Sequence, residues 1–304
     1  MLTHFWQGLG SELSERWVER ILTPAFLFWL GGLGAWAWRV GWWPLVRWFL
    51  QLDATVQGGL VVGGFLLVAL SGALVQRLEP WVLSGLEGYW PGWLDWLYRL
   101  GVRWQNSRLR RAEARWQELA QQGIDQLDPA QRRRFVELDI RRRRAPAKAV
   151  ERMPTALGNV LRAGELRPRD KYGLDAVVCW PRLWLLLPQD VREELARSRA
   201  GLEMAVRAWI WGMLFLLWYR MAWWTVPVGL VVAFLGYRMA LSTAATFADL
   251  VESTFDVHRT RLYKALRWPL PSDPKAERVE GAKVTAYLWR GSDEEHPAFV
   301  DGGE

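Results

Sequence analysis

Four apolar stretches stand out along the chain, each close to the roughly 20 residues with which a helix crosses the hydrocarbon core of a membrane. They cover residues 21–38, 56–75, 204–219 and 226–245. The third is the shortest and crosses only with the help of its flanking residues. Between the second and third stretches the chain is polar, and its apolar residues recur at helical spacing, so helices are predicted there as well.

The first and third apolar stretches end in nearly the same six residues. Residues 38–43 read WRVGWW and residues 219–224 read YRMAWW, and the apolar stretch after each copy contains Gly-Leu-Val-Val near its start. The repeated unit is a membrane hairpin, and both copies run in the same sense. We therefore expect an all-α polytopic membrane protein with four transmembrane helices as two hairpins, in-out-in twice, and a helical cytoplasmic domain between them.

This pattern divides the chain into six parts. They are an amphipathic interfacial helix (1–20), the first transmembrane hairpin (21–76), a basic cytoplasmic helical domain (77–203), the second transmembrane hairpin (204–245), a cytoplasmic extension of the fourth helix (246–271) and an acidic, partly disordered tail (272–304). Asp128 followed by Pro129 predicts a helix start. One apolar stripe continues past residue 245, so the fourth helix is predicted to run on until Pro269.

Composition and charge place these parts relative to the membrane. The chain has 304 residues, of which 51% are hydrophobic and 23 are Trp, and its formal net charge is +7. Basic residues flank the apolar stretches on one side and are scarce in the two Trp-Arg turns, which orients the turns outward. We expect both termini in the cytoplasm and the protein in a bacterial inner (plasma) membrane.

Three arginines are candidate ion or ligand contacts in the membrane region. Arg39 and Arg220 occupy the two turns, where either they snorkel into lipid phosphates beside the tryptophans or they form a positive ring that attracts anions. Arg238 lies about 18 Å into the fourth stretch. It either contacts a functional pathway or snorkels to the inner interface.

The segment from Pro154 to Pro188 is dense in distinctive residues. Thr155 is expected to cap a short helix through Arg162, and an apolar run broken by Pro181 follows a turn. The run is too short to span a membrane. The segment is either an interfacial elbow that docks the cytoplasmic domain or part of a permeation or ligand site that includes Asp175 and Arg182.

Seven arginines cluster in the cytoplasmic domain and are candidate contacts for lipid or a partner. They are Arg132, Arg133, Arg134, Arg141, Arg142, Arg143 and Arg144. The cluster is either a solvated helix paired with Glu137 and Asp139 or a surface for anionic lipid. Nucleic acid is not expected, because no zinc finger, recognition helix or aromatic stacking signature accompanies it.

Residues that carry chemistry are sparse. Cys179 is the single cysteine, and His4, His258 and His296 share no spacing of the kind that binds metals. There is no Gly-rich phosphate loop, no Ser or Cys paired with a His, and no carboxylate pair on an apolar span. We therefore expect no enzymatic activity, no cofactor and no metal.

Four strings in the latter half of the chain resemble a known family. PTALGN at Pro154, YGLD at Tyr172, WPRL at Trp180 and FDVHRTRLYKALRWPLP at Phe255 are similar to those of a family of bacterial multi-spanning integral membrane proteins of unknown function. The resemblance covers roughly residues 154–290 and implies a membrane protein with a soluble cytoplasmic part, without an activity or site. The layout also resembles bestrophin-type anion channels, in topology alone, since their Arg- and Trp-rich N-terminal signature is not evident.

Three functions fit these features. The first is a homo-oligomeric, channel-like membrane pore gated by its cytoplasmic helices. The alternative is a non-catalytic scaffold in which the spans anchor a basic platform for a soluble cytoplasmic protein or anionic lipid. A third is a small-molecule transporter that binds its substrate between the hairpins. In each case the lipid bilayer is a partner, and the pore requires several copies of the chain.

Overall fold

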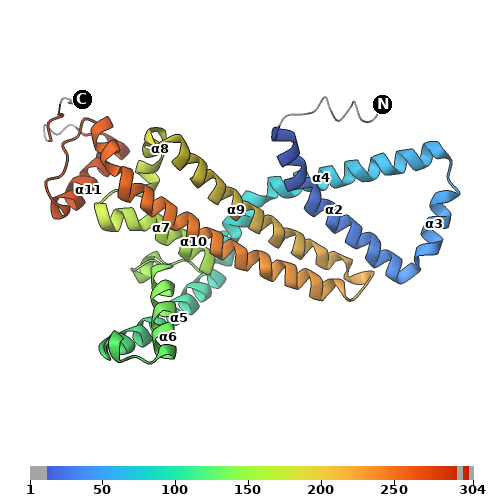
Figure 1. The fold of residues 1–304 in the computed structure, drawn as a ribbon, viewed down its shortest axis with the longest axis horizontal. Helices are drawn as coiled ribbons and strands as arrows, with labels where there is room; N and C mark the ends of the chain where they lie inside the picture. The colour runs from blue at the N-terminus through green and yellow to red at the C-terminus, as the bar shows by residue number, and fades with distance from the viewer. Residues whose placement is uncertain (1–11, 293–296, 301–304) are drawn as a thin grey trace. The chain divides into compact units, whose positions relative to one another are not determined.

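The computed structural model describes residues 12–292 and 297–300, with side chains from Pro24 onward, and the part it describes is helical without strands (Figure 1). The expected N-terminal helix lies mostly outside these residues. The helices are α2 (Glu12–Val40), α3 (Trp42–Leu50), α4 (Ala54–Glu87), α5 (Asp95–Gln121), α6 (Pro129–Arg143), α7 (Ala156–Tyr172), α8 (Ala176–Leu186), α9 (Gln189–Phe215), α10 (Thr225–Ala265) and α11 (Pro274–Arg290). Short 3-10 turns join several of them.

The chain forms two compact units. One consists of Met1–Leu83 with Leu202–Ala240, and the other of Ser84–Gly201 with Leu241–Glu304. We call them the first and second unit. Their boundaries fall inside α4, α9 and α10.

Three helical stretches within the described residues are long and apolar enough to cross a membrane. They are Ala54–Gln121, Gln189–Arg220 and Thr225–Ala265. The first expected span, 21–38, lies in α2, whose earliest side chains are outside the described part. The described residues therefore contain long apolar helices of the kind that a membrane protein requires, as predicted from the apolar stretches.

Glycines in the first unit bring helices close together. A Cβ on Gly236 of α10 would lie 2.6 Å from the backbone nitrogen of Trp209 of α9, so only glycine permits this approach. Gly31 and Gly32 of α2 receive the rings of Phe215 and Trp218 in the same way. Gly31 and Gly32 therefore serve close helix packing, whereas no described atom lies within 4 Å of a Cβ placed on Gly34.

The glycines of α4 behave differently. No described atom lies within 4 Å of the position a Cβ would take on Gly58, Gly59, Gly63 or Gly64. The helix is exposed on nearly all sides between residues 54 and 67. These four glycines thus make no close helix contact within the described part of this chain.

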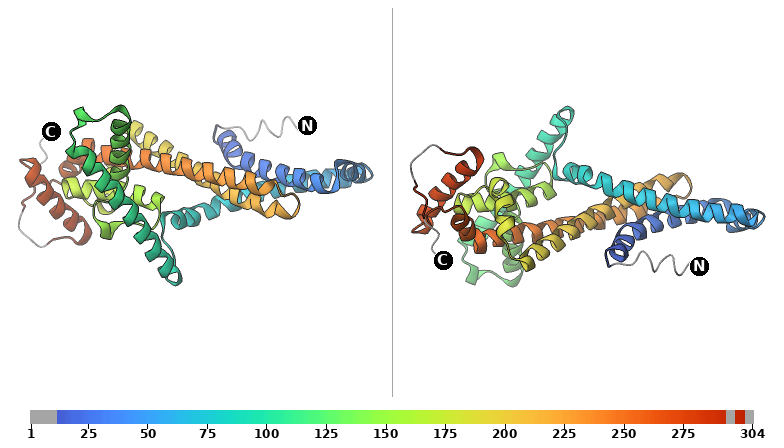
Figure 2. Two further views of the ribbon diagram at one scale, coloured as in Figure 1. Left: turned by 90° about the horizontal axis from the view of Figure 1, so that it is seen from below. Right: turned by 90° about the horizontal axis from the view of Figure 1, so that it is seen from above.

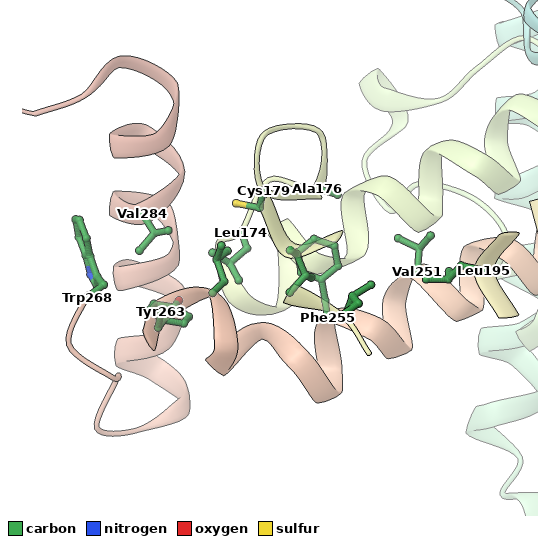
Figure 3. Close-up of a cluster of buried hydrophobic side chains, with 12 residues drawn as sticks. Leu174, Ala176, Cys179, Leu195, Val251, Phe255, Tyr263, Trp268 and Val284 are labelled. Atoms are coloured by element: carbon green, nitrogen blue, oxygen red, sulfur yellow. The ribbon is translucent and has the colours of Figure 1, made fainter. Parts of the chain in front are cut away.

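The second unit has a hydrophobic core between α8, α10 and α11 (Figure 3). Leu174, Cys179, Leu183, Phe255 and Tyr263 are fully buried in it. The described part of the tail contains a helix, because Asp273 caps α11 and Val284 of α11 is buried in this core. Pro274 follows the capping aspartate, which is the same start signal as in α6.

Two prolines lie inside helices that were expected to end. Residues 167–173 were expected to turn, but α7 runs through Pro168 to Tyr172 and ends at Gly173, whose φ of 75° is left-handed. Pro181 lies inside α8 without breaking it. The carbonyl that loses its hydrogen bond there belongs to Val177, which is exposed, so solvent or lipid headgroups can satisfy it.

The helices α5 and α6 pack side by side as a hairpin of the second unit (Figure 2). Their own small core contains Ala112, Leu119, Leu127 and Leu138, with Trp116 stacked on Phe135. Asp128 caps α6 in a complete capping box with Gln131, which confirms the predicted helix start.

Candidate functional site

The two Trp-Arg turns meet in the first unit. The guanidinium of Arg39 donates a hydrogen bond to the backbone carbonyl of Arg220 at 2.5 Å, across 181 residues of sequence. Both residues are exposed, as are Trp43 and Trp223 beside them. Two arginines and several indoles thus share one surface, where they can contact phosphate headgroups or anions.

A buried ion pair joins α4 to α9 in the same unit. Arg207 Nη1 lies 3.2 Å from Glu79 Oε2, and their side chains are only 11% and 8% exposed. From the sequence, Arg207 is one of the basic residues at the ends of the apolar stretches, and Glu79 was assigned no role. The signal was present in Glu79, a carboxylate just past the second apolar stretch, but its partner lies far away in sequence.

Arg238 faces away from the packed side of α10. Gly236 and Ala240, on either side of it, are buried, whereas Arg238 is exposed. No described carboxylate lies within ion-pairing distance of its guanidinium. Within the described part of the chain, this cation therefore has no counterion.

The PTALGN string clamps the end of α4 to the start of α7. Thr155 donates its hydroxyl proton to the carbonyl of Glu87 at 3.0 Å and accepts from the amide of Gly158 at 2.9 Å. A Cβ on Gly158 would lie 1.8 Å from the same carbonyl oxygen. Asn159 is buried and bonds the backbone of Met153 at both its amide and its carbonyl. The residues of this string are thus explained by packing and capping.

A small cavity of about 90 Å³ adjoins this clamp. Glu87, Arg162, Glu165 and Arg199 contribute charged groups to its lining. Burial raises the pKa of the Glu87 carboxyl, Arg199 opposes this and Glu165 adds to it. The cavity can hold a few water molecules beside a carboxyl group that takes up protons more readily than usual.

A row of charges fastens α7 to α10. Arg167 Nη1 lies 2.6 Å from Glu252 and 2.8 Å from Asp249. Lys171 lies 3.2 Å from Asp256, whose carboxylate also accepts the hydroxyl proton of Tyr172 at 2.6 Å. Since Arg167 and Lys171 are four residues apart, they lie on one face of α7. We call these contacts the α7–α10 charge row.

The elbow residues have local roles. Asp175 caps α8 by accepting from the amide of Val177 at 2.9 Å, and its own amide donates to the hydroxyl of Thr285 at 3.0 Å. Arg182 is exposed and donates to the carbonyl of Val178 at 2.9 Å. Asp175 directly precedes α8 as its cap, and Arg182 lies on α8. Apart from the bond between Asp175 and Thr285, the hydrogen bonds of both residues are made to the backbone of this helix.

The seven clustered arginines lie on and just after α6. Six of them are exposed, and Arg134 lies 3.7 Å from Glu137. Arg142 differs, because it pairs with Glu113 of α5 at 2.9 Å and lies 3.8 Å above the ring of Trp116. Most of the cluster thus remains available to an external partner, while Arg142 belongs to the α5–α6 hairpin.

No group of His, Cys, Asp and Glu suited to a metal ion occurs among the described residues. Comparison of the chain with models of protein families, with curated proteins and with solved structures finds no match. The site must therefore be interpreted from its own geometry.

Proposed function

We propose that this protein is a homo-oligomeric membrane pore with four spans, both termini on the cytoplasmic side of a bacterial inner membrane, and cytoplasmic helices that gate it. Arg238 carries the proposal. It lies on an apolar helix, is exposed, and has no described counterion. Placing an arginine at the centre of a lipid-facing helix costs about 2.5–3.5 kcal/mol on insertion scales, whereas an arginine that faces a water-filled lumen between subunits avoids that cost.

The surface of α4 supports assembly of several copies. Each glycine in a helix costs about 1 kcal/mol relative to alanine, so four glycines on an exposed apolar helix need a compensating contact. Gly59 and Gly63 form a small-x-x-x-small pair, with Gly58 and Gly64 beside them. Such pairs let helices of different subunits approach closely.

The α7–α10 charge row supports gating. α10 is a single helix from Thr225 to Ala265, so Arg238 and the acidic residues of the row lie on the same helix. Asp249, Glu252 and Asp256 are held by side chains of α7. A cytoplasmic event that moves α7 can therefore act on α10.

Ion flux through liposomes with the purified full chain tests the proposal. We expect flux that depends on protein, and Arg238→Gln should change the preference for anions over cations. Arg77→Gln is the matched control, because Arg77 is also an exposed arginine on a membrane-type helix but lies beyond the apolar stretch. No flux under any voltage or ionic condition, or equal effects of both variants, would contradict a pore.

The exposed arginines of α6 favour one second candidate, a membrane-anchored scaffold. Six exposed guanidinium groups can attract anionic lipid or an acidic soluble protein. A fusion of the second unit to an unrelated membrane anchor distinguishes the candidates. Function retained by this fusion supports the scaffold, and function lost with it supports the pore.

A further inference from the structure

A second, larger cavity lies in the second unit, between the α5–α6 hairpin and α7. Its volume is about 350 Å³. Four arginines line it: Arg142 and Arg143 at the end of α6, Arg152 in the segment before α7, and Arg167 on α7. No residue that lines the smaller cavity at Glu87 also lines this one, so the two are separate sites.

Arg152 is the central observation. Only 9% of its surface is exposed. Its guanidinium donates to three neutral acceptors: the carbonyl of Pro146 at 3.1 Å, the carbonyl of Ala147 at 3.4 Å, and the side-chain oxygen of Asn106 at 3.1 Å. No described carboxylate forms an ion pair with it. A buried cation that is held only by neutral groups is costly, and an anion beside it lowers that cost.

The pKa of Arg152 is in keeping with this environment. Burial lowers the pKa, the nearby Glu113 carboxylate raises it in part, and Arg110 lowers it further. The cation is thus under-compensated by the charges around it.

The neighbouring arginines differ in the donors that they offer. Arg143 is exposed, and no described carboxylate pairs with its side chain, whereas its carbonyl accepts from Arg167 at 2.5 Å. The Nε of Arg142 is buried without a hydrogen-bond partner among the described residues. Because this Nε is buried, Arg142 offers no accessible donor from it, and Arg143 is the exposed guanidinium group that the cavity has in addition to Arg152.

Three carboxylates also line the cavity, and each has a cationic neighbour. Glu113 lies 2.9 Å from Arg142, Asp139 lies 3.9 Å from Arg142, and Asp170 lies 4.0 Å from Arg169. They offset Arg142 and Arg169, and Arg167 is offset by α10. No described carboxylate forms an ion pair with Arg143 or Arg152.

We propose that this cavity binds a phosphomonoester, with Arg143 and Arg152 as its principal contacts. The planar guanidinium fork matches phosphate oxygens, and two such groups can balance a dianion. The volume exceeds what a phosphate group alone requires and lies at the lower end of the range for small-molecule sites, so an organic group attached to the phosphate fits beside it. The phosphate comes from a soluble metabolite or from a lipid headgroup.

Binding to the purified full chain in detergent tests the proposal, with glycerol 3-phosphate and inorganic phosphate as soluble probes and calorimetry as the measurement. Nanodiscs that contain phosphatidic acid, compared with phosphatidylcholine nanodiscs, test the lipid source. We expect saturable binding in the millimolar range or tighter. Binding of a soluble probe identifies a soluble source, and binding only of phosphatidic acid identifies the headgroup.

Arg143→Gln should weaken that binding about tenfold or more, because a charge-assisted hydrogen bond is lost. Arg144→Gln is the matched control, since Arg144 is the next residue, is exposed and does not line the cavity. Arg152→Lys keeps the charge and removes the fork, and its fold is checked by circular dichroism. No saturable binding of any probe, or equal weakening by Arg143→Gln and Arg144→Gln, would overturn the proposal.

Discussion

Breaking the buried ion pair between α4 and α9 should destabilise the first unit strongly. The perturbation is Glu79→Leu, which leaves the Arg207 guanidinium buried beside an apolar side chain. With a separation of 3.2 Å between Nη1 and Oε2 and an effective dielectric constant of about 20, the attraction between the unit charges is about 5 kcal/mol. Loss of one partner of such a buried pair costs about 3–5 kcal/mol, because the other charge is left uncompensated.

Thermal unfolding in detergent, followed by the fluorescence of the 23 tryptophans, measures the effect. A loss of this size lowers the midpoint by roughly 10 °C in a protein of this length. Arg207→Met should produce a similar loss. The double variant should recover most of the stability, because it leaves no unpaired charge.

The four proteins form a double-mutant cycle whose coupling energy isolates the pair from the other contacts of each residue. Arg77→Leu is the control, since Arg77 is exposed on the same helix and its removal should change stability by no more than about 0.5 kcal/mol. Single variants as stable as the parent, or a double variant whose loss equals the sum of the single losses, would refute the ion pair as the cause.

Other predictions follow from single positions. Burial raises the pKa of the Cys179 thiol from 9.0 to about 11, so it should resist maleimide at pH 8 until the protein unfolds. The folded state then holds the thiol proton more tightly than the unfolded state does. The stability that the protonated thiol contributes should therefore be lost as pH rises from 9.0 to about 11. Rapid labelling of the folded protein at pH 8 would contradict the raised pKa and the pH dependence that follows from it. Asp128→Ala should cost about 1 kcal/mol through loss of the α6 capping box, and an unchanged denaturation midpoint would show that the cap is dispensable. Tyr263→Phe should leave stability equal or higher, because the buried hydroxyl has no described hydrogen-bond partner, and a lower midpoint would reveal an additional partner. Gly236→Ala should disrupt the α9–α10 contact and reduce the yield of folded monomer on size-exclusion chromatography. Gly63→Ala should leave the folded monomer intact, because no described atom lies close to Gly63. Equal yields from the two variants would contradict the packing described for α10.

Features that depend on local sequence could be predicted. The starts of α6 and α7 follow from Asp128 and Thr155, whose side chains accept from amides a few residues ahead. The length of α10 follows from an apolar stripe that continues until prolines interrupt it. Helices of this kind carry their signals within a few turns of chain.

Features that depend on distant partners could not be predicted. The environment of Arg152 depends on Asn106, which lies 46 residues away in sequence. The pairing of Glu79 with Arg207 crosses a still longer interval. Asp175 was interpreted as a candidate ligand contact, whereas the structure shows that it caps α8, which continues through Pro181.

The clamp at Thr155 also has a consequence for the architecture of the second unit. The hydroxyl of Thr155 and the carbonyl of Glu87 meet although 68 residues separate them, so the chain segment that contains the α5–α6 hairpin begins and ends at one point of the unit. Together with its own small core, this makes the hairpin an inserted module. Such a module can be shortened, lengthened or exchanged while the ends of α4 and α7 stay joined. An exchange would replace Arg143 but leave Arg152, which lies between the hairpin and α7.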